Sequence, residues 1–198
     1  MDAGKPNDRY SAPHSAETEF EPGSNGRVLR NRLGMRTRRD VGLAEFALLY
    51  GVQELYLAER ISPSTTIDVA LIRQMHKDWL GSLNPWAGSF RTANVSKGGF
   101  AWPPAHRVPD LMSELERNTL SKLTPCSAGT VEQVARSLAI VHGELLLVHP
   151  FREGNGRIAR WVADLMATQA GFKPLAYRFA KNGSAARRAR YIAGGKRA

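Results

Sequence analysis

The sequence predicts an all-α fold, a compact helical bundle that carries one small β-hairpin. Most segments between residues 40 and 171 repeat apolar residues every three or four positions, which is the period of an amphipathic helix. One region, around Gly98 and Gly99, instead alternates apolar and polar residues on both sides of a turn signal, as hairpins do. Strands and helices do not alternate along the chain, which disfavours a parallel α/β sheet. With 198 residues and 42% hydrophobic composition, one domain can bury its own core.

The first two helices are predicted from apolar spacing and from their end signals. The first has Asp40 as its N-cap and runs to about Arg60. The second spans residues 67–80 and stops at Gly81. The buried stripe of the first helix is expected to consist of these residues: Val41, Leu43, Phe46, Leu49, Val52, Leu55 and Tyr56.

The hairpin and three further helices complete the predicted bundle. The hairpin lies within the sequence TANVSKGGFAW, and Pro103 and Pro104 end it. Pro109 suits the first turn of the next helix, which carries apolar residues as far as Leu120. A strong apolar stripe predicts a helix over residues 131–148, and the last helix starts near residue 155 or 156 and ends at Gly171.

The charge of the chain is unevenly distributed. The formal net charge is +10, yet residues 27–39 carry six arginines and no acid, and residues 171–198 carry eight basic residues and no acid. The rest of the chain has 14 basic and 18 acidic residues, so the body is mildly acidic. The two basic segments could bind nucleic acid or an acidic partner, or form a solvated surface and tail.

The composition also indicates a cytoplasmic protein that does not act at a membrane. A single cysteine, Cys126, excludes an internal disulfide and fits a reducing compartment. The polar N-terminus has no apolar run of a signal peptide or an anchor, and no other run is long enough to span a bilayer. We expect a flexible lead-in over residues 1–20, one domain over 21–178 and a basic tail over 179–198.

The segment HPFREGNGRIAR, residues 149–160, concentrates the chemistry of the chain. Gly154, Asn155 and Gly156 stand at the start of the last predicted helix, where backbone N–H groups lack partners and the helix dipole is positive. Such a helix start binds anions. Arg157 and Arg160 are three residues apart, so they share a face at this positive end. Two guanidiniums and open amides suit a polyphosphate.

Glu153 and His149 add a metal ligand and a base to this phosphate cradle. A carboxylate beside an anion site makes sense if Mg²⁺ bridges it to phosphate oxygens. His149 lies at the mouth of the same turn and titrates near neutrality, so it can accept a proton from an attacking hydroxyl. Phe151 would point the other way and anchor the loop. These are the components needed to transfer a group from a nucleotide to a hydroxyl.

The same segment matches the Fic motif, HxFx(D/E)GNGRxxR, at every fixed position. The chain resembles the Fic family over about residues 21–175, since GSFRTANVSKGGFAWPP is similar to the Fic flap and EPGSNGRVLRNRLG to the lead-in of many Fic cores. The resemblance implies the compact helical Fic fold. It also implies a protein adenylyltransferase, which transfers AMP from ATP to a Ser, Thr or Tyr hydroxyl of a target protein.

The resemblance assigns a role to each motif residue. His149 would deprotonate the target hydroxyl, and Glu153 would hold Mg²⁺ against the α- and β-phosphates of the co-substrate ATP. The other motif residues would bind the nucleotide: Gly154, Asn155 and Gly156 as the anion hole, Arg157 at a phosphate and Arg160 at the γ-phosphate. A kinase-like branch of the family has lysine in place of Gly156, so glycine favours AMP transfer over phosphorylation.

The flap and its regulation complete what the resemblance implies. The flap would pair with an extended piece of the target, main chain to main chain, and Lys97 and Gly98 would lie near the nucleotide. Many Fic proteins are inhibited by a helix with the pattern (S/T)xxxE(G/N). Here Ser15 to Glu19 fits in part, but Phe20 follows, so we interpret it as coincidence. We therefore expect a separate small antitoxin protein to supply the inhibitory helix, with this chain as the toxin.

The sequence is compatible with two alternatives. The same fold could use another donor: UMP, phosphocholine or phosphate. A basic nucleic-acid binder could use the two basic segments, although no known nucleic-acid-binding module is present and nucleic acid is disfavoured as a partner. A zinc deaminase is excluded, because His142 and Glu144 form H-x-E but the single cysteine precedes them.

Overall fold

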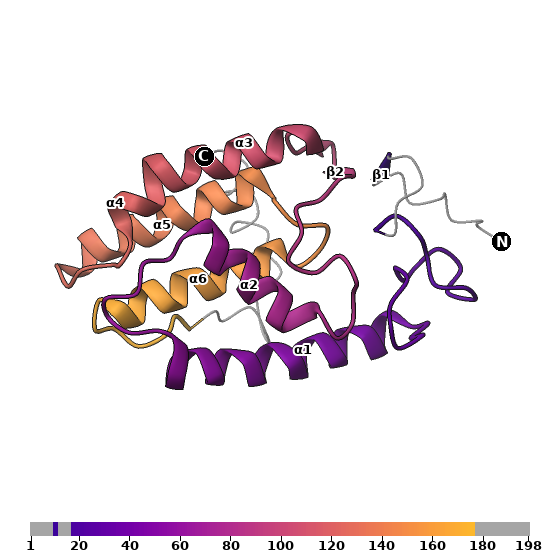
Figure 1. Cartoon of the computed structure of the whole chain (residues 1–198), viewed down its shortest axis with the longest axis horizontal. Helices are drawn as coiled ribbons and strands as arrows, with labels where there is room; N and C mark the ends of the chain where they lie inside the picture. The colour runs from indigo at the N-terminus through magenta and orange to yellow at the C-terminus, as the bar shows by residue number, and fades with distance from the viewer. Residues whose placement is uncertain (1–9, 12–16, 177–198) are drawn as a thin grey trace.

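The computed structural model of the chain describes residues 10–11 and 17–176, and it confirms a mainly helical fold with a small antiparallel sheet (Figure 1). The α-helices are α1 (Arg38–Leu55), α2 (Val69–Leu80), α3 (Val108–Leu115), α4 (Ser121–Leu123), α5 (Val131–Val148) and α6 (Asn155–Gln169). Two π-helical segments, η1 (Tyr56–Arg60) and η3 (Glu116–Leu120), and a 3₁₀ turn, η2 (Ala105–Arg107), join them. The strands are β1 (Tyr10–Ser11), β2 (Asn94–Lys97) and β3 (Phe100–Ala101).

Helix α6 lies in the centre of the bundle. Helix α5 packs along it, α3 packs on α5, and α2 lies between α6 and α1 (Figure 1). The predicted boundaries of α5 are confirmed, and a capping box formed by Thr130 and Gln133 explains its start. Most residues of α6 are buried, so the helix that follows the motif is held on nearly all sides. The motif therefore stands at the end of the most enclosed element of the fold.

Two predicted helix starts differ from the structure: the N-cap of α1 lies three residues earlier than predicted, and α2 begins two residues later than predicted. Asp40 is not the N-cap of α1, because the side chain of Thr37 accepts the N–H of Asp40 and the helix begins at Arg38. Helix α2 begins at Val69, since the Asp68 carboxylate accepts the N–H of Leu71 at 2.7 Å. In both helices the N-cap side chain lies three residues before the backbone amide whose hydrogen bond it accepts, and this bond sets the start of the helix.

The predicted buried stripe of α1 is wrong for several of its residues. Leu43 is 60% exposed and Phe46 is 69% exposed. Leu49, Val52 and the fully buried Tyr56 do pack against the core as predicted, and Ala44 and Leu48, which were not predicted, pack beside them. Helix α1 lies at the edge of the bundle and contacts it along one narrow side, so an apolar face remains in solvent. The expectation that no run is long enough to span a bilayer is wrong for this helix: by length and composition alone, Arg38–Arg60 is long and apolar enough to cross a membrane.

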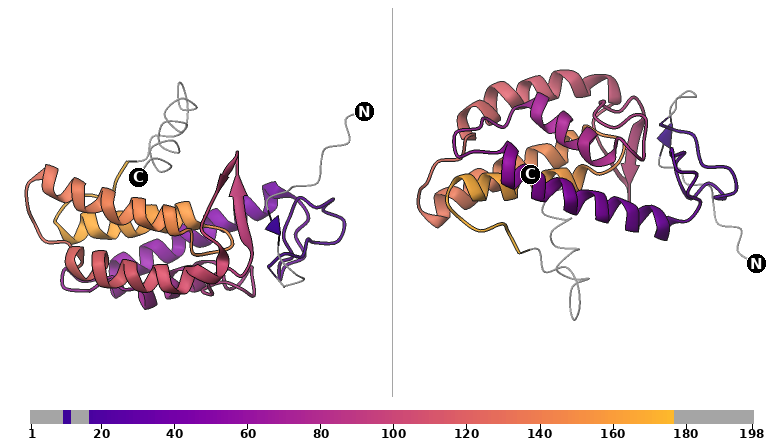
Figure 2. Two further views of the ribbon diagram at one scale, coloured as in Figure 1. Left: turned by 90° about the horizontal axis from the view of Figure 1, so that it is seen from above. Right: turned by 60° about the horizontal axis from the view of Figure 1, so that its bottom comes forward.

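The predicted hairpin is confirmed as β2 and β3, which we call the flap. Ser96 pairs with Ala101 and Lys97 with Phe100, in antiparallel register. Gly98 and Gly99 both have positive φ, at 57° and 78°, as a two-residue type I′ turn requires. Figure 2 shows the flap projecting from one end of the helical body. A third strand was not predicted: β1 pairs with the other edge of β2.

A buried arginine joins the base of the flap to the motif. Arg91 is 2% exposed, and its guanidinium donates to the carbonyl oxygens of Ala93, Pro103 and His149 at 3.0, 2.6 and 2.7 Å. The first two carbonyls stand before and after the flap, and the third belongs to the motif. Burial lowers the pKa of Arg91 to about 10, opposed by the charge of Glu17, so the guanidinium stays protonated at neutral pH.

The lead-in is attached to the same region. Glu17, 5% exposed, accepts hydrogen bonds from the Thr92 N–H and hydroxyl and from the Ala93 N–H. The carbonyl oxygen of Glu17 accepts the Nε–H of Arg152 at 2.7 Å. The predicted boundaries near residues 20 and 178 stay predictions, and the predicted tail at 179–198 lies outside the described residues.

Arg91→Met is expected to lower the free energy of unfolding by at least about 2 kcal/mol, because three carbonyl groups lose their shared donor. Urea unfolding of the parent and the variant measures this difference. Arg30→Met is the matched control, since Arg30 pairs with Glu19 where both side chains are largely exposed. The control should change the free energy by less than about 1 kcal/mol. Equal small changes in both variants would contradict the role assigned to Arg91.

Candidate active site

The motif loop connects α5 to α6 through two left-handed residues. His149 ends α5 with φ at 53°, and Gly154 precedes α6 with φ at 83°. A Cβ at Gly154 would stand 2.7 Å from the ring of Trp79, so both the backbone angle and the space require glycine there. Unlike glycine, His149 carries a Cβ that disfavours a positive φ, so the surrounding structure must hold its backbone in this conformation.

The side chain of Asn155 closes this loop. It accepts the N–H of Phe151 at 2.8 Å and donates to the Phe151 carbonyl at 2.7 Å, and it is 5% exposed. The backbone N–H groups of Asn155 and Gly156 have no acceptor within the described part of the chain. Helix α6 begins at Asn155 without a side-chain cap, so these amides are available to an anion.

His149 is held as a neutral base. Its ring stacks on Trp102 at 3.9 Å between centroids, and its Nδ1 lies 3.3 Å from the Leu146 carbonyl oxygen. A carbonyl can only accept, so Nδ1 carries the proton and Nε2 is the basic nitrogen. Burial lowers the pKa of His149 to about 4, helped by the charges of Arg91 and Lys97 and opposed by the bond to Leu146.

Glu153 lies next to the motif amides and is oriented by its neighbour. Its carboxylate is 3.5 Å from the guanidinium of the buried Arg152 and is 44% exposed. Residues 10–11 and 17–176 include no group of three or more histidine, cysteine or acidic side chains that could enclose a metal. Mg²⁺ is usually held by one or two carboxylates, waters and phosphate oxygens, so a single half-exposed Glu153 fits Mg²⁺ that arrives with a nucleotide.

The two motif arginines point to different neighbours. Arg157 forms an ion pair with Glu45 of α1 at 2.7 Å, and its guanidinium lies over the Trp79 ring at 4.6 Å. The Arg160 guanidinium folds back over Gly156, 3.6 Å from where a Cβ would be. Burial of His142 in α5, and to a lesser extent the charge of Arg160, lowers the pKa of His142 to about 4. The arginines thus flank the start of α6 on its α1 side and its α5 side.

The predicted flap residues lie at the far end of β2. Lys97 is exposed and ends the strand, and Gly98 begins the turn. Trp102, which directly follows β3, stacks on the His149 ring at 3.9 Å between centroids, so the base of the flap lies against the motif. The structure therefore places all predicted site residues around the start of α6 or on the flap beside it.

Several residues that support the site were missed by sequence reasoning. His76 of α2 is fully buried, stacks on Phe151 at 3.9 Å and accepts the Gly88 N–H through Nδ1. Its Nε2 therefore carries the proton and donates to the Glu153 carbonyl at 3.1 Å. The expected anchoring role of Phe151 is thus observed. Arg91, Glu17 and Glu45 were missed as well, and no local pattern marks any of these residues.

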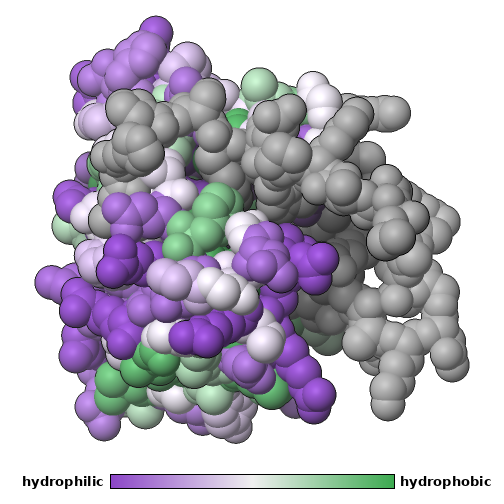
Figure 3. All heavy atoms as spheres, turned by 90° about the vertical axis from the view of Figure 1, so that its right-hand side faces the viewer, coloured by the Kyte–Doolittle hydropathy of each residue, from purple (hydrophilic) through white to green (hydrophobic). Residues whose placement is uncertain are grey.

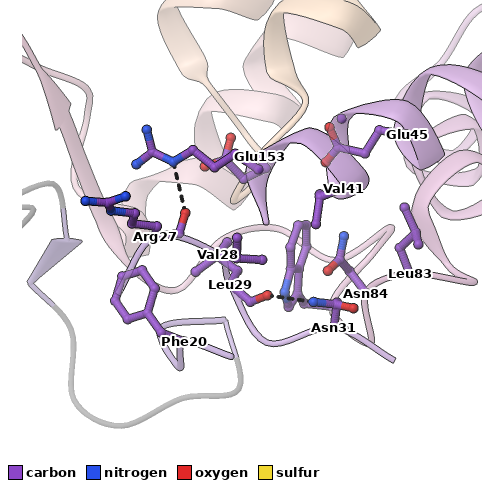
Figure 4. A pocket seen from close by; sticks show the side chains of 13 residues that line it. Phe20, Arg27, Val28, Leu29, Asn31, Val41, Glu45, Leu83, Asn84 and Glu153 are labelled. Carbon is purple, nitrogen blue, oxygen red and sulfur yellow. Dashed lines mark hydrogen bonds between the residues drawn. The ribbon is translucent and has the colours of Figure 1, made fainter. Parts of the chain in front are cut away.

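A pocket opens beside Glu153, between the lead-in and α1. Figure 4 shows Phe20, Arg27 and Val28 on one side and Glu153 and Glu45 across from them. The pocket is lined by Phe20, Arg27, Val28, Leu29, Asn31, Arg38, Val41, Gly42, Glu45, Leu83, Asn84, Trp86 and Glu153. The described surface at this end is mostly hydrophilic, with apolar side chains along the edge where α1 lies (Figure 3). The lead-in and α1 thus form part of the wall around the motif.

Comparison with known sequences gives related proteins over much of the chain. It is 36% identical over 110 residues to protein adenylyltransferase fic-1 of Caenorhabditis elegans, covering 55% of this chain and 21% of that protein. It is 28% identical over 168 residues to protein adenylyltransferase VbhT of Bartonella schoenbuchensis, covering 83% of this chain and 33% of that protein. The chain therefore spans about a fifth to a third of the length of these relatives.

Solved structures share the fold. The crystal structure of BepC, a VirB-translocated effector of Bartonella tribocorum with bound AMPPNP, superposes with a TM-score of 0.70 over 86% of each chain, at 20% identity. The sequence model described as the Fic/DOC family matches residues 66–167, which is more than half of the chain and includes α2, the flap, α5 and the whole motif. From its motif, its fold and this match, we conclude that the chain belongs to the Fic/DOC family.

Proposed function

We propose that this chain is a protein adenylyltransferase that transfers AMP from ATP to a hydroxyl side chain of a target protein. The observation that carries the proposal is the position of a neutral imidazole, His149, beside the uncapped start of α6. The names of the two relatives, protein adenylyltransferases fic-1 and VbhT, support the same activity. The AMPPNP bound to BepC supports an adenine nucleotide as the donor.

In this reaction the target hydroxyl attacks the α-phosphorus of ATP. Nε2 of His149 accepts the hydroxyl proton while the new P–O bond forms, and the bond to the β-phosphate breaks to release pyrophosphate. The stack on Trp102 and the bond to Leu146 hold the ring in one orientation, so the basic nitrogen keeps its direction. Its low pKa keeps the imidazole ready to accept at neutral pH.

The start of α6 would bind the phosphates. The open N–H groups of Asn155 and Gly156 would donate to oxygens of the α-phosphate, where negative charge must be stabilised in the transition state. Arg157 would contact a phosphate while Glu45 and Trp79 hold its guanidinium in place, and Arg160 would bind the γ-phosphate. Glu153 would hold Mg²⁺, which neutralises phosphate charge.

We also propose that the chain is a cytoplasmic toxin whose antitoxin supplies an inhibitory helix in trans. The partial inhibitory pattern at Ser15 to Glu19 does not serve this purpose, because Glu19 pairs with Arg30 at 2.8 Å on the surface. In an inhibited complex, a glutamate of the antitoxin would pair with Arg160 and exclude the γ-phosphate.

Incubation of the purified chain with Mg²⁺, ATP labelled at the α-phosphate and a bacterial lysate is expected to label at least one lysate protein. His149→Ala should lower the labelling at least about 100-fold, because a positioned base contributes roughly that factor. Mass spectrometry of the labelled protein should give the mass of an AMP adduct. ATP labelled at the γ-phosphate is the matched control, and label from that position would contradict AMP transfer in favour of phosphorylation.

The initial rate at subsaturating ATP is expected to be nearly the same at pH 5.5 and pH 7.5. Above about pH 4 the buried His149 stays neutral, whereas a histidine with the usual pKa of about 6.5 would be only about 10% neutral at pH 5.5. Circular dichroism at both pH values should accompany the rates. The folded state must be checked because acid destabilises the fold. The pKa values of three histidines, His76, His142 and His149, are lowered in the folded chain, so the unfolded chain binds more protons between about pH 4 and 6.5. A tenfold lower rate at pH 5.5 in the folded protein would contradict a depressed pKa.

Expression of the chain without a partner is expected to arrest bacterial growth, because no antitoxin is present to occupy the nucleotide site. Growth curves of cells expressing the parent and His149→Ala at matched protein levels measure this effect. Normal growth with a parent that labels lysate proteins in vitro would contradict the toxin assignment and leave the transfer activity standing.

A further inference from the structure

We propose that the outer face of α1 binds a second copy of this chain, with the two α1 helices packed side by side in antiparallel directions. The outer face consists of six exposed residues: Arg39, Leu43, Phe46, Ala47, Tyr50 and Glu54. Its three large apolar side chains, Leu43, Phe46 and Tyr50, are 60%, 69% and 62% exposed. Figure 2 shows α1 on the outside of the bundle, where no other described helix or strand covers this face. The inference does not depend on the proposed transfer of AMP.

The apolar residues of the outer face form one continuous strip on a helix that the body holds in place. Leu43, Phe46 and Tyr50 follow one another at spacings of three and four positions, so they share one side of the helix. Single exposed apolar side chains are ordinary, whereas a contiguous strip marks an interaction surface. On the inner side, the Trp79 indole N–H donates to the Glu45 carbonyl at 2.8 Å, and Tyr56 is fully buried. The strip is therefore preformed, which lowers the cost of docking.

The charges at the two ends of the outer face identify the occupant. Arg39 precedes the apolar strip and Glu54 follows it, and neither forms an ion pair with another residue among 10–11 and 17–176. A partner of one charge, such as an anionic lipid surface, would attract one of these side chains and repel the other. A second α1 that runs in the opposite direction places Arg39 of each copy beside Glu54 of the other. Both charges are then matched, and the contact forms twice.

The spacing of the apolar residues fits the same arrangement. The point midway between Arg39 and Glu54 lies between Phe46 and Ala47. Leu43 and Tyr50 are equally distant from this point, so a two-fold axis there sets Leu43 of each copy against Tyr50 of the other. The two Phe46 rings meet beside the axis, and the small Ala47 side chains let the helices approach closely. One register therefore satisfies the charged and the apolar residues together, as a self-complementary contact requires.

The size of this surface indicates a weak dimer. One pair of helices buries less than the roughly 800 Å² per partner of a standard interface, so we expect dissociation constants in the micromolar range. The apolar side chains would supply most of the affinity, because exposed ion pairs contribute little. The ion pairs would select the antiparallel direction, since parallel helices would place like charges together.

Analytical ultracentrifugation of the full chain between about 1 and about 300 µM is expected to show a reversible monomer–dimer equilibrium. Phe46→Glu should weaken the dimer at least about tenfold, because it brings two carboxylates together beside the axis. Ile140→Glu is the matched control, since Ile140 is 43% exposed on α5, which packs on α6 and α3. The control should associate like the parent. The substituted side chains are exposed, and circular dichroism checks that each variant is folded.

Charge reversal tests the direction of the two helices. Arg39→Glu and Glu54→Arg should each weaken the dimer about tenfold at low salt, because each change turns two attractive pairs into two repulsive ones. The double variant, with both substitutions, should return to within about threefold of the parent, since the pairs form again with their signs exchanged.

Three results would overturn the proposal. The first is a parent that stays monomeric over the whole concentration range. The second is a dimer that Phe46→Glu and Ile140→Glu weaken equally, because the contact would then lie away from α1. The third is a double charge variant as weak as the single variants, since Arg39 and Glu54 would not face each other. A monomeric parent that binds vesicles with about 30% phosphatidylserine, and loses this binding in Phe46→Glu, would assign the outer face to lipid instead.

Discussion

The buried guanidinium of Arg91 connects the flap to the motif, and the geometry of the site depends on it. One planar group donates to carbonyls from three segments: the chain before the flap, the chain after it and His149. Only arginine offers enough donors in a rigid plane for this arrangement. Because Ala93 and Pro103 bracket the hairpin, the flap and the histidine are held at a fixed separation. Glu17 adds an opposite charge beside this cation and bonds to the same stretch of chain.

This connection explains how a histidine at the end of an apolar helix stays neutral and oriented. Its left-handed backbone breaks α5 and turns the ring toward the flap, where Trp102 covers it. Trp102 is itself fixed, since its indole N–H donates to the Leu146 carbonyl, which also lies near the His149 Nδ1. Burial and two nearby cations then favour the uncharged imidazole. The same contacts that shape the site therefore set its protonation state.

Residues outside the family match complete the site. The match begins at residue 66, yet Glu17 bonds to the loop before the flap and to Arg152, and Glu45 holds Arg157. Strand β1 comes from still earlier in the chain and lies against the flap. The lead-in and α1 therefore contribute directly to the arrangement of the motif, although their own sequence carries no catalytic signature. Such residues affect the site through orientation and charge, by way of the groups that would contact the nucleotide.

The sequence by itself determined the features that depend on neighbours a few positions apart. These include the all-α character, the span of α5, the glycine turn of the flap and the start of α6 at the motif, because periodicity, turn chemistry and caps act locally. Tertiary structure alone decided which face of α1 meets the core, and it brought His76, Arg91, Glu17 and Glu45 to the motif. Those contacts join residues separated by more than fifty positions, and the partner of a buried polar group is set by what the packed chain places beside it. The spacing of residues along the sequence does not predict which residue that partner will be.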